Sequence, residues 1–331
     1  MKKLTKITAL FLTITLMLSA CSGSSGKSDK STNPAGQRIG VVMANLTNAN
    51  YILMADEFKR YGEELGYEVL ITDTNDDTTK AVTAAENYAT MGVDALVFSP
   101  MDTDVATSAT EAAKNINPDL PCVIAAIEVE AMDFGVIQSD EDAGYILGIE
   151  AGKWINENME GSAQVGLIAI WGGTLIIRTQ AFQRGVQDTV TGNVEFIEQT
   201  FDRSGGRTGY EIMEDWLQGY PELKVIFGAA DSMCLGSYEA LKAAGLNEDE
   251  YAIYGVDGTQ NAIAALKEGG AFRGTADSGA TATPLAIIDV VTALLQGTDP
   301  ESMSVTIPPK VVNQSNVDGW AYDYNWVEIK K

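Results

Sequence analysis

The chain has 331 residues, with 22 Lys and Arg against 46 Asp and Glu, no His, and a formal net charge of −24 at pH 7. This excess of acid excludes a nucleic-acid partner, because phosphate binding needs a basic face that releases counterions. The lack of histidine in the sequence excludes Ser-His-Asp and Cys-His catalysis and the common histidine-containing zinc sites.

The N-terminal segment has the pattern of a bacterial secretion signal that ends in a lipobox. Three lysines precede the apolar run at residues 7–18, and residues 18–21 read Leu-Ser-Ala-Cys. The pattern predicts a lipoprotein signal peptide over residues 1–20, whose cleavage makes Cys21 available for lipid attachment. A transmembrane anchor is the alternative, but the apolar run is shorter than the roughly 20 residues that span a bilayer.

The residues after Cys21 predict a flexible tether. Residues 22–36 read SGSSGKSDKSTNPAG and hold almost nothing apolar, so they cannot contribute to a core. We therefore expect a tether over residues 21–36 and a folded body from Gln37 onward. The expected location is extracytoplasmic, on the outer face of the cell membrane as in a Gram-positive cell, with the lipid anchor as the membrane contact.

Short apolar runs alternate with longer amphipathic stretches throughout this body. Each run is nearly continuous in apolar character, which predicts strands buried on both faces of a parallel sheet. The predicted strands occupy residues 39–44, 68–72, 95–99, 122–127, 165–170, 195–201, 225–229 and 252–256.

The stretch at residues 49–66, ANYILMADEFKRYGEELG, illustrates the predicted helices. Its apolar residues Met54, Phe58, Tyr61 and Leu65 form one stripe at helical spacing. Gly66 is the expected C-terminal cap, since glycine readily adopts the left-handed conformation that ends a helix.

The alternation of strands and helices predicts an α/β fold with two doubly wound parallel sheets, since eight strands are too many for one ordinary sheet of this kind. At about 100–200 residues per domain, residues 37–331 also suggest two domains. The boundary is expected near Ser139, within FGVIQSDEDAG. A ligand is expected beyond the carboxyl ends of the strands, in the cleft between the two lobes.

Two further features have ordinary structural explanations. Cys122 and Cys234 are expected as buried thiols, although the sequence leaves a disulfide between them open. The acidic segment at residues 73–77 lacks the glycine and the downstream Glu of a calcium loop, so a capped helix start before Lys80 is the better explanation.

Several motifs, taken in their order and spacing, resemble one family. They are GVVMANLTNANY, ELGYEVLITDTNDD, MGVDALVFSPMDTD, QSDEDAG, QTFDRSGG, GAADSMCLGSYEALKAAG and YGVDGTQNAIAALKEG. The chain resembles the type I periplasmic sugar-binding proteins, the ribose- and galactose-binding receptors of ABC importers, over residues 38–314.

The resemblance implies two doubly wound parallel-sheet lobes joined by a three-crossover hinge. The first lobe would comprise residues 37–139 and 279–308, and the second residues 140–278 and 309–331. It also implies a monomer that holds a monosaccharide or related polyol in the cleft, closes around it, and docks onto an ABC permease driven by a cytoplasmic ATPase. No cofactor and no metal are implied.

The same resemblance implies five residues that bind the ligand. Asn48 would form hydrogen bonds with the ligand, Asp257 would accept from two hydroxyl groups, and Arg178 would donate from its rigid fork. Tyr51 and Phe201 would cover the apolar C–H face of a sugar. Alternatives remain for each kind of residue, namely a plain turn at Asp257, core packing for the two aromatic rings, and a surface ion pair for Arg178.

Four positions depart from the family pattern for ribose. Asn50 replaces one aromatic residue of an Asn-Pro-Phe-Phe loop, and Ile127-Glu128 replaces an Asp-Arg pair. Ala230 and Ser278 replace the usual Asn and Gln. Each buried polar group that loses its partner costs about 1–3 kcal/mol, so we expect a ligand other than ribose, with Asn50, Glu128 and Ser278 among its contacts.

Two functions from different classes of receptor remain open. The first is a substrate-binding lipoprotein that feeds an importer. The second is a receptor for a furanose-like autoinducer or a nucleoside, which presents its ligand to a membrane sensor. An enzyme is not predicted, because no motif assigns catalytic roles to the carboxylates Glu128, Asp140, Asp231, Asp257 and Asp277. Whether the ligand is a pentose, a hexose, a polyol or an amine-bearing compound also remains open.

Overall fold

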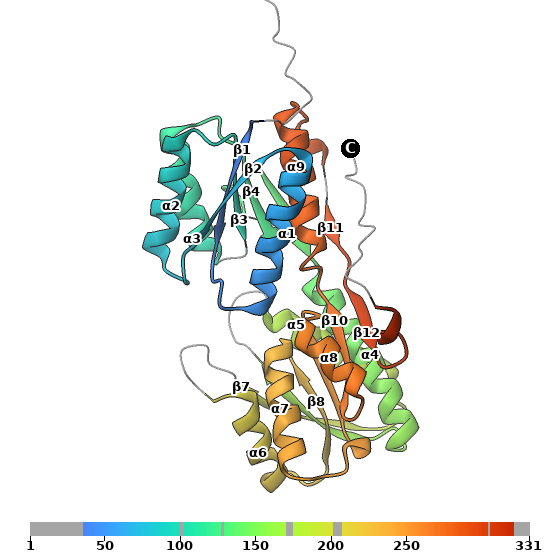
Figure 1. The fold of residues 1–331 in the computed structure, drawn as a ribbon. Helices are drawn as coiled ribbons and strands as arrows, with labels where there is room; N and C mark the ends of the chain where they lie inside the picture. The colour runs from blue at the N-terminus through green and yellow to red at the C-terminus, as the bar shows by residue number, and fades with distance from the viewer. Residues whose placement is uncertain are drawn as a thin grey trace, which may run out of the picture. The chain divides into compact units, whose positions relative to one another are not determined.

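The computed structural model describes residues 36–99, 102–126, 129–169, 175–200, 207–303 and 305–320, all within one compact unit. These residues form two six-stranded sheets with helices on both faces of each (Figure 1). The α/β fold with two sheets is therefore confirmed. The predicted signal peptide and Cys21 lie outside the described residues.

The first sheet has the strand order β11-β5-β4-β3-β1-β2, and all of its described pairings are parallel. Its strands are β1 (Arg38–Met43), β2 (Glu68–Asp73), β3 (Ala95–Ser99), β4 (Cys122–Ala126), β5 (Phe134–Gln138) and β11 (Thr306–Ile307). Helices α1 (Ala49–Leu65) and α9 (Ala282–Leu295) cover one face, and α2 (Thr78–Met91) and α3 (Thr103–Ile116) cover the other (Figure 1). We call this part of the structure the first lobe.

The second sheet has the strand order β12-β10-β9-β8-β6-β7. Its strands are β6 (Ala163–Ala169), β7 (Val194–Thr200), β8 (Leu223–Gly228), β9 (Ala252–Val256), β10 (Phe272–Asp277) and β12 (Lys310–Asn313). Helices α4 (Asp140–Asn158) and α5 (Leu175–Thr189) cover one face, and α6 (Gly209–Gly219), α7 (Asp231–Ala243) and α8 (Gln260–Glu268) cover the other. We call this part the second lobe.

The chain passes from one sheet to the other three times. It leaves the first sheet after β5, returns to it between β10 and α9, and leaves it again between β11 and β12. These passages bring the carboxyl ends of β5 and β10 to the residues that join the sheets. The strand β12 pairs antiparallel with β10. The second sheet is therefore mixed, and the prediction of a fully parallel sheet is corrected at this edge.

Each face of each sheet has its own apolar core. Strand residues such as Val41 and Val97 face α1 and α9, whereas Val42 and Phe98 face α2 and α3. Alternating residues of one strand therefore enter two different cores, and both sets are apolar. This is why the strands appear in the sequence as continuous apolar runs.

The predicted helix boundaries are confirmed at both kinds of terminus. The helix α1 ends at Gly66, which has a left-handed φ of 98°. The helix α2 begins at Asp77, whose side chain accepts a hydrogen bond from the backbone N–H of Lys80. The acidic segment before Lys80 is thus a helix cap. Cys122 and Cys234 are both buried free thiols.

Four strands of the structure were not among the predicted runs. They are β5, β10, β11 and β12, of which β11 has only two residues and β10 carries Arg273, Gly274 and Asp277. Each lies at or next to an edge of its sheet or near a passage between sheets, where polar residues are tolerated. None of the helices in the described ranges combines the length and the apolar character that crossing a membrane requires.

Gly92→Ala is expected to lower the free energy of unfolding by about 1–2 kcal/mol, because Gly92 ends α2 with a left-handed φ of 69° that costs an L-residue about this much. Urea denaturation measures this change. Gly219 in α6 is a matched control, because a Cβ there also meets nothing within 4 Å but its φ is not left-handed. Gly219→Ala should be neutral or slightly stabilising; equal losses in the two variants would contradict the conformational explanation.

Candidate functional site

Carboxylates gather at the carboxyl ends of three neighbouring strands in the second lobe. Asp231 follows β8, Asp257 follows β9, and Asp277 is the last residue of β10. Because these strands are parallel and adjacent, their carboxyl ends lie along one edge of the sheet. Residues at this edge are where ligands of such sheets bind.

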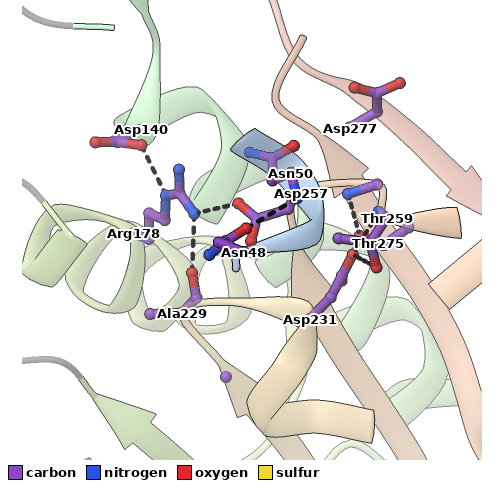
Figure 2. A network of polar contacts seen from close by, with 12 residues as sticks. Asn48, Asn50, Asp140, Arg178, Ala229, Asp231, Asp257, Thr259, Thr275 and Asp277 are labelled. Carbon is purple, nitrogen blue, oxygen red and sulfur yellow. Dashed lines mark hydrogen bonds and ion pairs between the residues drawn. The ribbon is translucent and has the colours of Figure 1, made fainter. Parts of the chain in front are cut away.

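Arg178 connects this edge to the start of α4. Its guanidinium Nε donates to Asp140 Oδ1 at 2.7 Å, and its Nη1 donates to Asp257 Oδ1 and to the carbonyl oxygen of Ala229, each at 2.9 Å. Figure 2 shows Arg178 between the two carboxylates. Arg178 is only 6% exposed, so the alternative of a surface ion pair is wrong.

The partners of Arg178 stabilise its charged form. Burial alone would lower the pKa of the guanidinium, but the negative charges of Asp257 and Asp140 raise that pKa above its ordinary value. The side chain is therefore a permanently charged fork whose orientation is set by three acceptors. A fork held in this way needs little reordering when a ligand arrives.

Glycines allow α4 and α5 to approach closely and so position Arg178. A Cβ on Gly144 would collide with the backbone carbonyl of Arg178, and a Cβ on Gly148 would collide with that of Phe182. On α5, a Cβ on Gly185 would collide with the carbonyl of Tyr145. The two helices thus pack backbone against backbone, which brings Asp140 on α4 within reach of Arg178 on α5.

Asp257 has a backbone conformation that few residues with side chains adopt. Its φ is 125°, and its N–H donates to the carbonyl of Ala276 at 2.9 Å. The next residue, Gly258, has a φ of 69°, and its N–H donates to Thr275 Oγ1 at 3.1 Å. The segment is a turn, as the sequence allowed, but its strained residue also carries the carboxylate that binds Arg178. Such strain is characteristic of functional positions.

Asp231 lies beneath Asp257 and is completely buried. Its Oδ1 accepts from Thr275 Oγ1 at 2.7 Å, and its Oδ2 accepts from the backbone N–H and the hydroxyl of Thr259 at 2.8 and 3.0 Å (Figure 2). Asp231 therefore ties together the ends of β8, β9 and β10. Burial and the nearby charge of Asp257 raise the pKa of Asp231 to about 8, against the effect of the three donors.

The raised pKa of Asp231 predicts a pH dependence of stability. Between the ordinary carboxyl pKa of 3.8 and about 8, the folded state keeps a proton that the unfolded state has lost, so stability falls as pH rises. Relative to Asp231→Asn, the parent should lose about 1 kcal/mol of unfolding free energy between pH 6 and pH 7. Denaturant unfolding of both proteins at several pH values measures this; parallel pH profiles would show that Asp231 is ionised in the folded state.

Three predicted site residues of the first lobe lie at the N-terminus of α1. Asn48 is the N-cap, and its Oδ1 accepts from the backbone N–H of Asn50 at 2.8 Å. Asn50 is 9% exposed, and its Oδ1 has no hydrogen-bond partner among the described residues. Tyr51 is partly buried against the core under α1 and α9. Figure 2 shows Asn48 and Asn50 in the same close view as Asp257.

Ser278 lies where the chain passes from β10 to α9. It is 4% exposed, and its Oγ has no hydrogen-bond partner within the ranges that the structure describes. The predicted site residues Glu128 and Phe201 lie outside those ranges, as does Cys21. The structure thus brings Arg178 and Asp257 into direct contact. Contact with a ligand stays a prediction for all of the predicted site residues.

A cavity of about 240 Å³ lies between the N-terminal turns of α1 and α8. Asn50 and Thr259 both line this cavity. Figure 2 shows Asn50 near Asp257 and Thr259 near Asp231, so the cavity lies next to the polar network. The remaining lining residues are Ala49, Ile52, Leu53, Asp56, Gln260 and Asn261. No group of three or more potential metal ligands occurs among the described His, Cys, Asp and Glu residues.

Two residues of this polar network were missed as site residues. The sequence offers Asp140 and Asp231 as carboxylates, but no motif assigns a role to either. The signal that was available is their place in the chain, because each is the first residue of a helix that follows a strand. Asp140 is connected to Asp257 through Arg178, and Asp231 lies close to Asp257. No local pattern in the sequence contains these tertiary contacts.

Comparison with known proteins gives consistent matches over most of the chain. A family model described as "Periplasmic binding protein domain" matches residues 39–299. The ribose import binding protein of Bacillus subtilis (strain 168) is 26% identical over 268 residues, which cover 80% of this chain and 85% of the relative. A xylitol-binding protein of Mycolicibacterium smegmatis is 24% identical over 308 residues, which cover 92% and 83%.

Solved structures have the same fold. An ABC transporter solute binding protein from Bacillus halodurans C-125 with bound myo-inositol superposes with a TM-score of 0.73 at 25% identity, and the match covers 86% of this chain and 97% of that chain. One from Actinobacillus succinogenes 130z with bound D-allose has a TM-score of 0.75 at 17% identity, with 86% and 100% covered. The second likeness is one of fold alone.

Proposed function

We propose, on the premise that the chain belongs to the type I periplasmic sugar-binding protein family, that it is an extracytoplasmic receptor for a monosaccharide or related polyol. The members of this family that were compared above are binding proteins of transport systems. The chain is therefore a binding protein and not an enzyme. Membership of this family also implies an extracytoplasmic location. The proposed partner is an ABC permease with a cytoplasmic ATPase, which receives the ligand.

The observation that carries this proposal is the buried fork of Arg178 between Asp140 and Asp257. A polyol offers hydroxyl groups that both donate and accept hydrogen bonds. An ionised carboxylate has about four acceptor sites, so Asp257 can accept from hydroxyl groups while it stays paired with Arg178. The Asp257 side chain is 15% exposed and that of Arg178 is 7% exposed, so a ligand would meet both in a largely desolvated place.

The proposed first-lobe contacts complete the site. Asn48 and Asn50 would exchange hydrogen bonds with hydroxyl groups, and Tyr51 would cover the C–H face. Ser278, at the passage between β10 and α9, would offer a further hydroxyl. We also retain Glu128 and Phe201 as contacts on the basis of the sequence.

We propose a neutral sugar or polyol other than ribose as the ligand. Asn50, Glu128, Ala230 and Ser278 differ from the family pattern for ribose, and Ala230 leaves more room than an amide would for the hydroxymethyl group of a hexose. The relatives named above bind ribose, xylitol, myo-inositol and D-allose, which are all neutral compounds with several hydroxyl groups and the size of a monosaccharide.

The proposed movement is closure of the two lobes about the three passages between the sheets. We assign residues 37–139 and 279–308 to the first lobe and residues 140–278 and 309–331 to the second. Solution scattering should show a smaller radius of gyration with saturating ligand. A scattering profile that stays unchanged when binding is saturated would indicate a rigid site.

The proposed anchor is a lipid on Cys21, the residue that follows the predicted signal peptide. Cys21→Ser should release the protein from membranes. Mass spectrometry of the mature protein should find a lipid-modified N-terminal Cys21; unmodified residues upstream of Cys21 on the mature protein would contradict the proposal.

A thermal-shift screen of the mature body against monosaccharides, polyols, nucleosides and amines tests the function. A ligand at 100 times its Kd adds about 2.7 kcal/mol to the free energy of unfolding, which a thermal shift detects. The expected result is stabilisation by a neutral sugar or polyol, more strongly than by ribose, and recovery of that compound unchanged after incubation. Stabilisation by nucleosides alone, or conversion of the ligand, would refute the proposal.

A further inference from the structure

The cavity between α1 and α8 has the lining of a site for a second hydroxylated unit. Asn50, Gln260 and Asn261 supply amides, Thr259 supplies a hydroxyl and Asp56 supplies a carboxylate. Ile52 and Leu53 supply apolar surface on the α1 side. Amides donate hydrogen bonds to hydroxyl groups and accept from them, and a carboxylate accepts from them, while an aliphatic surface suits the C–H face of a ring.

Asn50, which is also one of the first-lobe contacts proposed above, gives a second indication of a ligand in the cavity, beside the lining itself. It is more than nine-tenths buried, lines the cavity, and has an Oδ1 without a hydrogen-bond partner among the described residues. Buried polar side-chain atoms normally have a partner, so this oxygen is expected to accept from a donor that enters the cavity. Asn50 also stands where the family pattern has an aromatic residue, so this acceptor is a departure from that pattern.

The cavity continues from the polar network of the second lobe. Thr259 lines the cavity and donates to Asp231, and Asp231 in turn lies beside Asp257. On the first-lobe side, Asn50 lines the cavity and lies near Asp257 in Figure 2. A ligand that extends from Asp257 into the cavity would therefore pass Asn50 and Thr259. At about 240 Å³, the cavity is smaller than the pockets of about 300–1,000 Å³ that enclose drug-sized ligands, so it suits one additional small unit.

We propose that this cavity is a second subsite and that the protein takes a two-unit neutral glycoside, with one unit at Arg178 and Asp257 and the second between α1 and α8. The proposal rests on the proposed function, because the unit at Arg178 and Asp257 is the monosaccharide or polyol proposed there, and it extends that ligand by a second unit. The carboxylate of Asp56 lines the cavity, and the chain as a whole has a formal net charge of −24. Both negative charges disfavour an anionic second unit such as a sugar phosphate.

Isothermal titration calorimetry with matched probes tests the subsite. The one-unit probes are D-glucose, D-allose, myo-inositol and xylitol, and the two-unit probes are maltose, lactose and galactinol, the galactoside of myo-inositol. At least one two-unit probe is expected to bind tenfold or more tightly than its one-unit counterpart. Glucose 6-phosphate is expected not to bind.

Two variants of α8 locate the effect. Asn261→Trp fills the cavity from an exposed position, so it should remove the tenfold advantage of the two-unit probe while the Kd of the one-unit probe stays within twofold. Ala264→Trp, one turn further along and outside the cavity lining, should leave both affinities unchanged. The melting temperatures of both variants show whether they are folded.

The outcomes separate this proposal from the one on which it rests. If one-unit probes bind but no two-unit probe binds more tightly, the second subsite is overturned and the proposed function stands. The same conclusion follows if Asn261→Trp weakens both kinds of probe equally. If no probe of either size binds, the proposed function itself fails.

Discussion

Arg178→Ala is expected to lower the free energy of unfolding by about 3–5 kcal/mol, because it leaves the carboxylates of Asp140 and Asp257 and the carbonyl of Ala229 without their shared donor. The loss is large because the arginine side chain is 93% buried, so water cannot replace it fully. Urea denaturation measures the effect. The same variant should bind sugars or polyols too weakly for calorimetry to detect.

Arg184 on the same helix provides the matched control. It pairs with Glu141 at 2.7 Å, as close as Arg178 to Asp140, but its side chain is 49% exposed. Arg184→Ala should therefore change stability by less than about 1 kcal/mol. Equal effects of the two substitutions would mean that burial does not strengthen the Arg178 contacts. Arg178→Lys should recover only part of the loss, because a lysine cannot donate along the same fork.

Asp257→Ala is expected to weaken ligand binding by about 2–4 kcal/mol, because it removes a charged acceptor and leaves the hydroxyl groups that used it unpaired. Its effect on folding should be smaller than that of Arg178→Ala, since Arg178 keeps Asp140 and Ala229 as acceptors. Calorimetry with the tightest ligand from the thermal-shift screen measures the change in affinity.

Asp249→Ala controls for loss of one negative charge from the second lobe, because the Asp249 side chain is 87% exposed. It should leave the affinity unchanged. If Asp257→Ala stays within a factor of three of the parent, Asp257 is not a ligand contact and the proposed site is wrong.

Local patterns in the chain are sufficient to predict those elements whose stability is local or whose burial is complete. The strands β1, β3 and β4 were predicted because both of their faces enter a core, which requires uninterrupted apolar residues. The caps at Gly66 and Asp77 were predictable because a helix terminus is satisfied by residues within one turn. The family could be inferred because its motifs are local stretches of sequence whose order and spacing can be read along the chain.

The strands at the passages between the sheets needed the tertiary structure. In β10, Arg273 donates to the carbonyl of Tyr251, and Asp277 ends the strand at the site, so neither residue contributes to an apolar run. The two residues of β11 and the four of β12 are defined only by their pairing with β5 and β10. Segments of two and four residues are too short to show the alternation of a strand, and their hydrogen-bond partners are far away in the sequence.

The chemistry of the site, like the fold, is in part predictable from the sequence and in part evident only from the structure. The residue types at the strand ends, including Arg178 and Asp257, follow from the sequence and its resemblance to a family. The burial of Arg178 between Asp140 and Asp257, 38 and 79 residues away, is evident from the fold alone, as is the rise of the Asp231 pKa to about 8. Burial and charge pairing depend on which segments meet in space, and the backbone approach of α4 and α5 at their glycines brings these segments together.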